Sequence, residues 1–426
     1  MAARTAHIDS WYFQTANAVT DRPALVGEAR CDVAVLGAGY TGLYAALTLA
    51  RRGYKVTVLE AVRVGWAASG RNGGQIVTGY ARSMAEVEAA VGKDDAHRLW
   101  ALNEEAKTLI RDTVAVESID CDLTWGYLFT ALKQRQVDDL HGMVKEWANG
   151  YGYEGLEILD TTRTREIVDS PRYIGALHDR GSGHLHPLNY ALGLAEACER
   201  AGVTIYEDSR VTAIDSSATP SFTTDSGRLR ADYLVLAGNA LLGGLVPSIH
   251  ARIAPVGTYI AATAPLGSNR MQSLLSQNVA VCDMNFVLNY FRKSPDDRLL
   301  FGARVSYSGR DPADLAQQMR TSMLKVFPQL TDVVFETVWG GLVDITMNRL
   351  PHLGRISPTT YFAQGFSGHG VALSGIAGKV IGEALAGSAE RFDVFARIPH
   401  HAFPGGPFRI PLLRLGMLWF RLRDLM

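Results

Sequence analysis

The segment from Cys31 to Glu60 constrains the fold of this chain more than any other. It reads CDVAVL, then GAGYTGLYAALTLARRG, then YKVTVLE. The first and last runs are apolar, and apolar residues of the middle run recur at helical spacing. This order predicts a strand, a tight turn, a helix and a second strand. Gly37, Gly39 and Gly42 give the turn the pattern GxGxxG.

A turn of this kind holds the pyrophosphate of a dinucleotide. Gly37 permits the sharp bend, Gly39 lets the backbone approach the phosphates, and Gly42 lets the helix pack close to the strand. The N–H groups at the start of the helix then face the phosphate charge. Glu60 can accept hydrogen bonds from the adenosine ribose, and its charge would repel a 2′-phosphate. The unit therefore disfavours NADP and leaves NAD and FAD.

A second glycine-rich loop follows within the run VRVGWAASGRNGGQIVTGY. Residues Ser69 to Gln75 are small, polar and rich in backbone groups, so they could wrap a flat polar ring and donate hydrogen bonds to it. An NAD-binding domain has no need of such a loop at this point, which favours FAD. A flexible surface loop has the same composition, so the loop alone leaves both interpretations open.

The composition indicates a globular enzyme with two domains. The chain has 426 residues, 47% of them hydrophobic, and a formal net charge of −1, which does not favour nucleic acid as a partner. Its 4 cysteines are scattered without CxxC or metal-ligand spacing, which predicts reduced thiols, a cytoplasmic location and no metal. We expect no signal peptide, and no apolar run reaches the roughly 18 residues that span a bilayer.

Later segments predict further elements of the same fold. Residues 121–132 are expected to form a pair of strands, and residues 252–340 an antiparallel sheet interrupted by an amphipathic helix at 312–327. The apolar run 233–237 predicts a strand that ends at Gly238, where a small residue would let a cofactor pass.

The segment TTYFAQGFSGHGVALSGIAGKVIGEALAG repeats the order strand, glycine loop, helix over residues 361–386. A helix N-terminus placed there offers partial positive charge to an anionic group. In a flavin enzyme that group is the N1–C2=O edge of the ring, which becomes negative on reduction. A helix packed through small residues is the alternative.

Taken in order, GAGYTG, ASGRNGGQ, LVLAGNA and QGFSGHGVALSG resemble the FAD-dependent oxidoreductases of the D-amino-acid-oxidase and glycine-oxidase-like superfamily. SWYFQTAN, VGWAASGRNGGQIV, GSGHLHPLN, FSGHGV and RFDVFARIPHHAFPGG are similar to its gamma-glutamylputrescine oxidoreductase branch, and the likeness covers nearly the whole chain. The resemblance implies an α/β protein. A glutathione-reductase-type, FAD-binding Rossmann-like domain would be interleaved with a smaller α+β substrate domain built on an antiparallel sheet.

The resemblance also implies how the chain is divided. We expect an N-terminal arm at 1–30 and a C-terminal amphipathic tail at 396–426. The arm looks irregular in sequence, and its aromatic run Trp11, Tyr12 and Phe13 indicates that it packs onto the body of the protein. The FAD-binding domain would be discontinuous and comprise 31–80, 185–250 and 335–395. The substrate or cap domain would comprise 81–184 and 251–334.

An extended FAD is implied, with its ring between the two later glycine segments. It would be noncovalent, because no cysteine lies in 339–354, where some relatives attach flavin. The residues expected to contact FAD are Gly37, Gly39, Tyr40, Thr41, Gly42, Glu60, Ala61, Ser69, Gly70, Arg71, Asn72, Gly73, Gly74, Gln75, Val211, Ala237, Gly238, Gly340, Gly368, His369, Gly370 and Val371.

The implied reaction moves a hydride from an amine-bearing carbon to flavin N5, after which water hydrolyses the imine and oxygen reoxidises the flavin to give hydrogen peroxide. The protein mainly orients the carbon and excludes water. Within the superfamily, amino-acid oxidases commonly carry an Arg just after the residues matching WGGL, and sarcosine-oxidase-like members a Lys just after GHGV. Here Val343 and Ala372 stand at these positions. This favours an amine in polyamine catabolism, such as gamma-glutamylputrescine.

Three residues are candidates for the chemistry. Asp344 could hold a substrate ammonium, and His369 could donate or accept a hydrogen bond near the flavin. Arg349 could bind a carboxylate, which favours a rival substrate, a cyclic secondary amino acid such as L-pipecolate, with oxygen or a quinone as acceptor. An ion pair between Arg349 and Asp344 is the structural alternative.

Two further alternatives stay open. The chain could bind flavin without catalysing a reaction. In the tail, Leu412, Leu415 and Trp419 recur on one helical face, which could contact a membrane surface or dock onto the protein itself.

Overall fold

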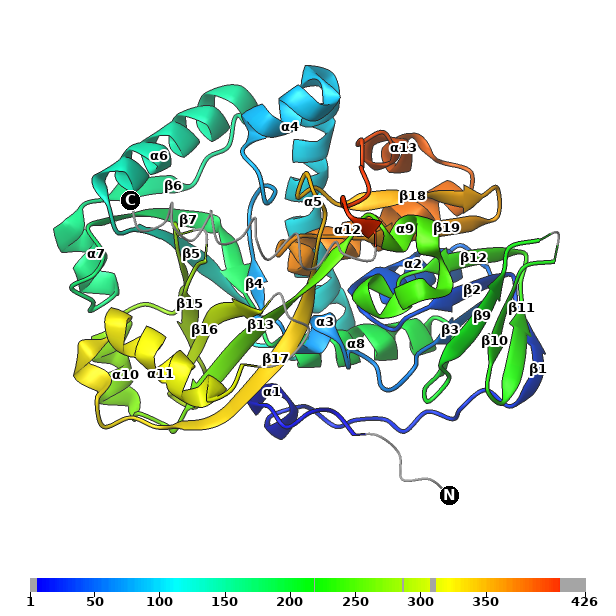
Figure 1. Cartoon of the computed structure of the whole chain (residues 1–426), viewed down its shortest axis with the longest axis horizontal. Helices are drawn as coiled ribbons and strands as arrows, with labels where there is room; N and C mark the ends of the chain where they lie inside the picture. Colours follow the sequence, from blue (N-terminus) through cyan, green and yellow to red (C-terminus); the bar gives the residue numbers. More distant parts are fainter. Residues whose placement is uncertain (1–5, 218, 286, 307–311, 407–426) are drawn as a thin grey trace.

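The computed structural model describes residues 6–217, 219–285, 287–306 and 312–406. These residues form three sheets with helices packed around them (Figure 1). Within these ranges, no helix combines the length and the apolar character needed to cross a membrane. The predicted apolar face of the C-terminal tail lies outside the described residues.

The predicted nucleotide unit forms the centre of a six-stranded sheet of order β18-β19-β12-β2-β3-β8. Neighbours pair in parallel except at the edge, where β18 is antiparallel to β19. Val35 pairs with Val58 on one side and Val235 on the other, and all three have an exposed fraction of 0%, as expected for central strands. The strands are β2 (Val33–Leu36), β3 (Val56–Leu59), β8 (Thr204–Tyr206), β12 (Tyr233–Leu236), β18 (His352–Ser357) and β19 (Thr360–Gln364).

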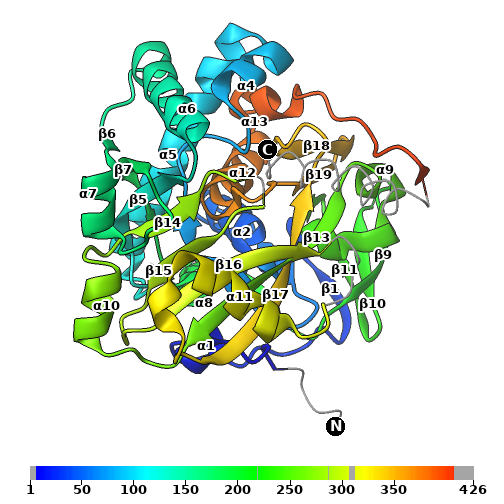
Figure 2. The same ribbon diagram turned by 60° about the vertical axis from the view of Figure 1, so that its left-hand side comes forward.

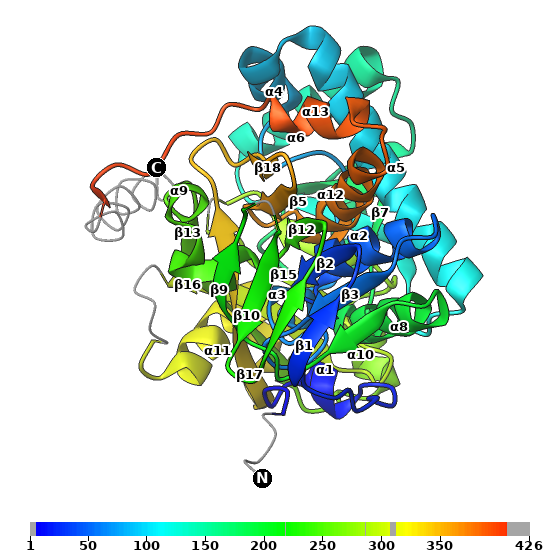
Figure 3. The same ribbon diagram turned by 90° about the vertical axis from the view of Figure 1, so that its right-hand side faces the viewer.

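This sheet is covered on both faces. One face packs against the helices α2 (Tyr40–Ala50), α8 (Pro187–Arg200) and α12 (Gly370–Leu385), and α5 (Lys93–Glu117) packs against α12 and α8. The other face packs against a four-stranded sheet, and Ala34 and Leu234 share its core with Phe222 and Leu229. Figure 3 shows this small sheet turned toward the viewer. Its strands, in spatial order, are β1 (Gly27–Arg30), β11 (Gly227–Arg230), β10 (Ser221–Thr224) and β9 (Val211–Asp215).

The third sheet has nine strands and is mostly antiparallel, as predicted for the substrate domain. Its order is β17-β13-β16-β15-β14-β5-β7-β4, and β6 pairs with β7. Figure 2 shows α11 (Leu315–Val326) lying across this sheet, where Met319 and Met323 pack against Phe291 and Phe301. The strands are β4 (Gln75–Ile76), β5 (Thr124–Ala131), β6 (Leu156–Leu159), β7 (Gly175–His184), β13 (Ala254–Thr263), β14 (Ala280–Asp283), β15 (Tyr290–Lys293), β16 (Leu299–Ser306) and β17 (Phe335–Ile345).

Shorter elements complete the described chain. They are α1 (Trp11–Gln14), α3 (Ala68–Arg71), α4 (Met84–Val91), α6 (Gln134–Lys145), η1 (Glu146–Gly150), α7 (Thr161–Ile167), η2 (Asn239–Leu245), α9 (Pro247–His250), α10 (Ser268–Leu274), η3 (Pro328–Leu330) and α13 (Glu390–Ala396).

Two sequence expectations about elements were wrong. The predicted pair of strands at 121–132 is one strand, β5, whose pairing with β7 shifts between Trp125 and Tyr127. Gly126, with φ of +124°, forms the irregularity that resembles a turn in the sequence. The first thirty residues are not wholly irregular, because α1 and β1 lie within them. The predicted domain boundaries stay a prediction, although β17, placed with the FAD-binding segments, pairs with β13 of the nine-stranded sheet.

Candidate functional site

A cavity of about 660 Å³ lies at the carboxyl ends of the central parallel strands. Leu36 at the end of β2, Leu59 at the end of β3 and Ala237 just after β12 line it. This is the edge where open α/β sheets bind ligands. The cavity brings together many of the predicted cofactor residues: Gly37, Gly39, Tyr40, Thr41, Glu60, Ala61, Ser69, Asn72, Val211, Ala237, Gly238, Gly368, Gly370 and Val371.

The first glycine turn leaves no room for side chains. Gly37 has φ of +102°, and a Cβ on it would lie 2.8 Å from the carbonyl oxygen of Ala237. A Cβ on Gly42 would lie 1.9 Å from the carbonyl oxygen of Gly37, and one on Gly39 would lie 2.8 Å from Ser69 Oγ. At Gly37 and Gly39 the turn therefore presents backbone without side chains to the cavity, the form of a phosphate-binding turn.

Glu60 closes the adjacent strand and lines the same cavity. Its Oε2 accepts a hydrogen bond from Ala38 N at 2.9 Å, and its Oε1 accepts one from Val62 N at 3.0 Å. Burial raises the pKa of Glu60, and these backbone hydrogen bonds oppose the shift. The carboxylate is thus fixed beside the glycine turn with room on the cavity side for a ribose.

The segment from Ser69 to Gln75 was predicted as a loop, but it begins within the short helix α3 and ends in β4, and its own hydrogen bonds connect the two. Asn72 Nδ2 donates to the carbonyl of Ala68 at 2.9 Å, and Asn72 Oδ1 accepts from Gly74 N at 2.7 Å. The guanidinium of Arg71 lies 4.0 Å from the ring centre of Trp66, and its Nε donates to the carbonyl of Trp66. Burial lowers the pKa of Arg71 to about 10.

The late glycine loop leads into α12 and faces the end of β17. Asp344 of β17 lines the cavity beside Gly368 and Gly370 and is 1% exposed. The carbonyl of Asp344 accepts a hydrogen bond from Ser367 N at 2.9 Å. The predicted alternative for α12 also holds, since a Cβ on Gly378 would lie 2.1 Å from the carbonyl of Thr41 in α2. Small residues thus bring the two helices, and both glycine loops, close together.

Some predicted residues do not line this cavity. Burial, followed by the positive charge of Arg349, lowers the pKa of His369 to about 4, so the imidazole is neutral at pH 7. Neither His369 nor Arg349 belongs to the lining. The predicted residues outside the lining are Gly42, Gly70, Arg71, Gly73, Gly74, Gln75, Gly340, Arg349 and His369.

Other lining residues escaped the sequence reasoning. Trp66 directly precedes the second glycine loop, and Thr212 directly follows Val211, so extending each motif by a few residues would have found both. Leu241 and Leu245 of η2 also line the cavity, but nothing in the sequence marks them as more than apolar residues after a strand.

These features define a nucleotide-cofactor protein with a Rossmann-type sheet and a long cavity at its switch edge. The chain belongs to the family of FAD dependent oxidoreductases described as DAO, which matches residues 32–384. The predicted family is thereby confirmed, as are the α/β class and FAD as cofactor.

Relatives and solved structures agree with this assignment. The chain is 42% identical over 422 residues to a gamma-glutamylputrescine oxidoreductase of Escherichia coli K12, covering 99% of each chain. It is 41% identical to a probable oxidoreductase OrdL of Haemophilus influenzae, covering 98% of this chain and 97% of that one. The fold is similar to the crystal structure of glycine oxidase from Geobacillus kaustophilus, with a TM-score of 0.71, 22% identity and coverage of 85% and 95%.

The residues present fit FAD. The bare glycine turn suits the pyrophosphate, and Glu60 suits a ribose. Arg71 and His369 lie outside the lining but directly beside the lining residues Asn72 and Gly368. Arg71 Nη2 and His369 Nδ1 are buried and have no hydrogen-bond partner within the described part of the chain. A polar ring edge in this region would give such atoms partners.

Proposed function

We propose that this protein is an FAD-dependent amine oxidoreductase whose substrate is gamma-glutamylputrescine or a related amine. The observation that carries the proposal is 42% identity across 99% of the chain to the E. coli enzyme of that name. The cavity wall supports it, because Asp344 contributes an acidic group and Val343 stands where amino-acid oxidases commonly carry an Arg. Ala372, which does not line the cavity, stands where sarcosine-oxidase-like members carry a Lys.

The chemistry that bound FAD would supply is two-electron oxidation of the amine carbon, with oxygen as the final acceptor and hydrogen peroxide as the product. The residues of the chain would do the positioning. Asp344 would attract the ammonium form of the substrate amine. After the nitrogen has released a proton to water, its lone pair forms C=N as the C–H bond breaks and the hydride leaves. Water would then hydrolyse this imine to an aldehyde and ammonia. The first N–H groups of α12 would face the negative charge that reduction creates.

The rival substrate, a cyclic secondary amino acid, depends on Arg349 as the ligand of a carboxylate. Arg349 does not belong to the cavity wall, and its charge acts instead on His369. The rival therefore has less support than the amine, and it remains a distinct outcome of the experiment below.

The test is anaerobic reduction of the purified yellow protein by single compounds. We expect gamma-glutamylputrescine to bleach the flavin absorbance faster than putrescine, L-pipecolate or L-proline. Bleaching by L-pipecolate or L-proline alone would replace the amine with the cyclic substrate. No bleaching across the panel would leave a flavin-binding protein without this activity. Peroxide release in air separates an oxidase from a quinone-linked dehydrogenase.

A further inference from the structure

Arg292 of β15 is a cation buried among neutral groups. Its side chain is 2% exposed. Nε donates to the carbonyl of Gly73 at 3.2 Å, and Nη2 donates to the carbonyl of Leu185 at 3.1 Å and to the Tyr12 hydroxyl at 3.4 Å. Nη1 lies 3.5 Å from the carbonyl of Lys293. Carbonyls and one phenol thus surround this guanidinium.

Other buried arginines of the described chain have carboxylate partners. Arg22 Nε lies 2.7 Å from Glu199, and Arg63 Nη1 lies 2.6 Å from Asp208. No such ion pair within 4.0 Å involves Arg292 among the described residues. At longer range its charge only opposes the burial that raises the pKa of Asp122. Burying a charge without a close counter-charge is costly, so this arrangement calls for an explanation.

The position of Arg292 offers an explanation for this buried positive charge. It binds the carbonyl of Gly73, the residue directly after Asn72 in the cavity wall. A Cβ on Gly74 would lie 3.4 Å from Arg292 Nη2, and a Cβ on Gly73 would lie 2.7 Å from the ring of Tyr290, two residues along the same strand. The cation therefore stands directly behind the glycine loop that is expected to carry the flavin ring.

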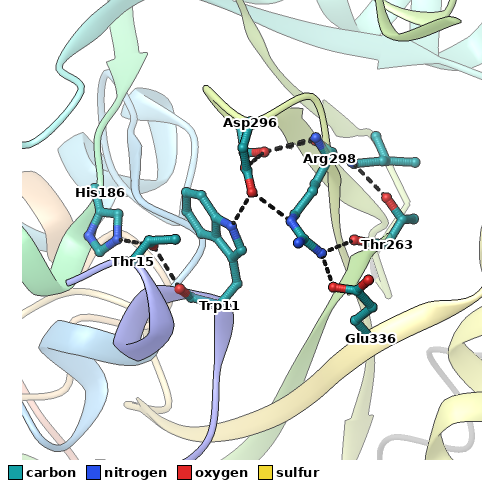
Figure 4. Close-up of polar contacts among 9 residues, drawn as sticks. Trp11, Thr15, His186, Thr263, Asp296, Arg298 and Glu336 are labelled. Atoms are coloured by element: carbon teal, nitrogen blue, oxygen red, sulfur yellow. Dashed lines mark hydrogen bonds and ion pairs between the residues drawn. The ribbon is translucent and has the colours of Figure 1, made fainter. Parts of the chain in front are cut away.

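The N-terminal helix α1 shields this cation from water. Tyr12 is 0% exposed, and its ring packs edge-on against Trp339 and His186. Figure 4 shows the neighbouring anchors of α1: Trp11 Nε1 donates to Asp296 at 3.3 Å, and Thr15 Oγ1 lies 3.1 Å from His186 Nε2. Exclusion of water lowers the local dielectric constant, which lengthens the reach of the Arg292 charge.

We propose that Arg292 sets the reduction potential of the bound cofactor. This inference rests on the proposed function. In that reaction the hydride leaving the amine carbon would add negative charge to the cofactor, whose ring is expected near the segment from Ser69 to Gln75. The positive charge of Arg292 behind this segment would stabilise the reduced cofactor.

The test compares neutral and charged replacements in the FAD-loaded protein. Arg292→Met and Arg292→Gln remove the charge, and Arg292→Lys keeps it. We expect both neutral variants to have a more negative midpoint potential and to bind sulfite, an anionic probe of flavin electrophilicity, more weakly by on the order of tenfold. Arg292→Lys should stay near the wild type in both measurements.

Arg298→Gln is the matched control. Arg298 lies close by in sequence, but Asp296 and Glu336 neutralise it (Figure 4). Its loss should leave the potential and sulfite affinity unchanged. Neutral variants that match Arg298→Gln would overturn the inference, as would a Lys variant that shifts as far as Gln. If the Arg292→Gln variant does not fold, the apolar Arg292→Met variant alone provides the comparison of potential and sulfite affinity. Wild-type protein that binds no FAD would instead defeat the proposed function.

Discussion

Asp344 places a second carboxyl group, besides that of Glu60, in the wall of the cavity. It is 1% exposed, and its strand brings it to the late glycine loop. A charged group so far from solvent contributes strongly to binding a cation, because hydrogen bonds to charged groups are stronger than neutral ones.

Replacing this carboxylate by an amide should therefore weaken catalysis more than cofactor binding. We expect Asp344→Asn to lower kcat/KM for the amine substrate by roughly ten- to a hundredfold, the loss of one charged hydrogen bond. Glu336→Gln, on the same strand but paired with Arg298, is the control and should behave like wild type. Equal kcat/KM values for the two variants, at equal FAD content, would remove Asp344 from substrate binding.

The role of a single residue can be predicted from the sequence when its interaction partners lie within the same short motif. The glycine turn was predictable because Gly37, Gly39 and Gly42 act through steric limits within one short motif. Arg292 was not, since its meaning comes from Gly73 and Tyr12, which lie 219 and 280 positions away in the chain. Nothing in the sequence distinguishes Arg292 from a surface arginine.

At the scale of elements, the short helix α1 connects two parts of the protein. It spans only Trp11–Gln14, capped by Ser10, yet it contacts both α8 and the nine-stranded sheet. The aromatic run in the sequence predicted packing but not its place. The prediction for residues 121–132 was limited in a similar way. Gly126 suggested a turn between two strands, whereas the structure has one strand, β5, with an irregular register at this glycine.

The arm should contribute to stability through one residue of this helix. Trp11→Ala should lower the free energy of unfolding by about 3–5 kcal/mol, because Trp11 is 3% exposed. Phe13 in the same helix is 36% exposed, so Phe13→Ala should cost less than about 1 kcal/mol. Urea unfolding followed by circular dichroism gives both values. Similar losses for the two variants would show that α1 does not anchor the arm.

At the scale of the whole molecule, the cavity joins segments from Leu36 to Ser374. Its ligand should therefore stabilise the chain as a unit. FAD at 100 times its dissociation constant should add about 2.7 kcal/mol to the free energy of unfolding of the apoprotein. Riboflavin, which lacks the pyrophosphate and adenosine recognised at Gly37 and Glu60, should raise Tm much less at the same concentration. Equal shifts in calorimetry would argue against FAD binding at the glycine turn.

The order of strands has a consequence for synthesis on the ribosome. The central strand β12 (Tyr233–Leu236) sits between β2, made some two hundred residues earlier, and β19, made more than a hundred residues later. Until Thr360–Gln364 has emerged, β12 keeps an open edge, and such edges recruit strands from other chains. Translation must therefore pass β19 before the nascent protein can close its cofactor sheet, and a premature stop before β19 should yield an aggregation-prone fragment rather than a weaker enzyme.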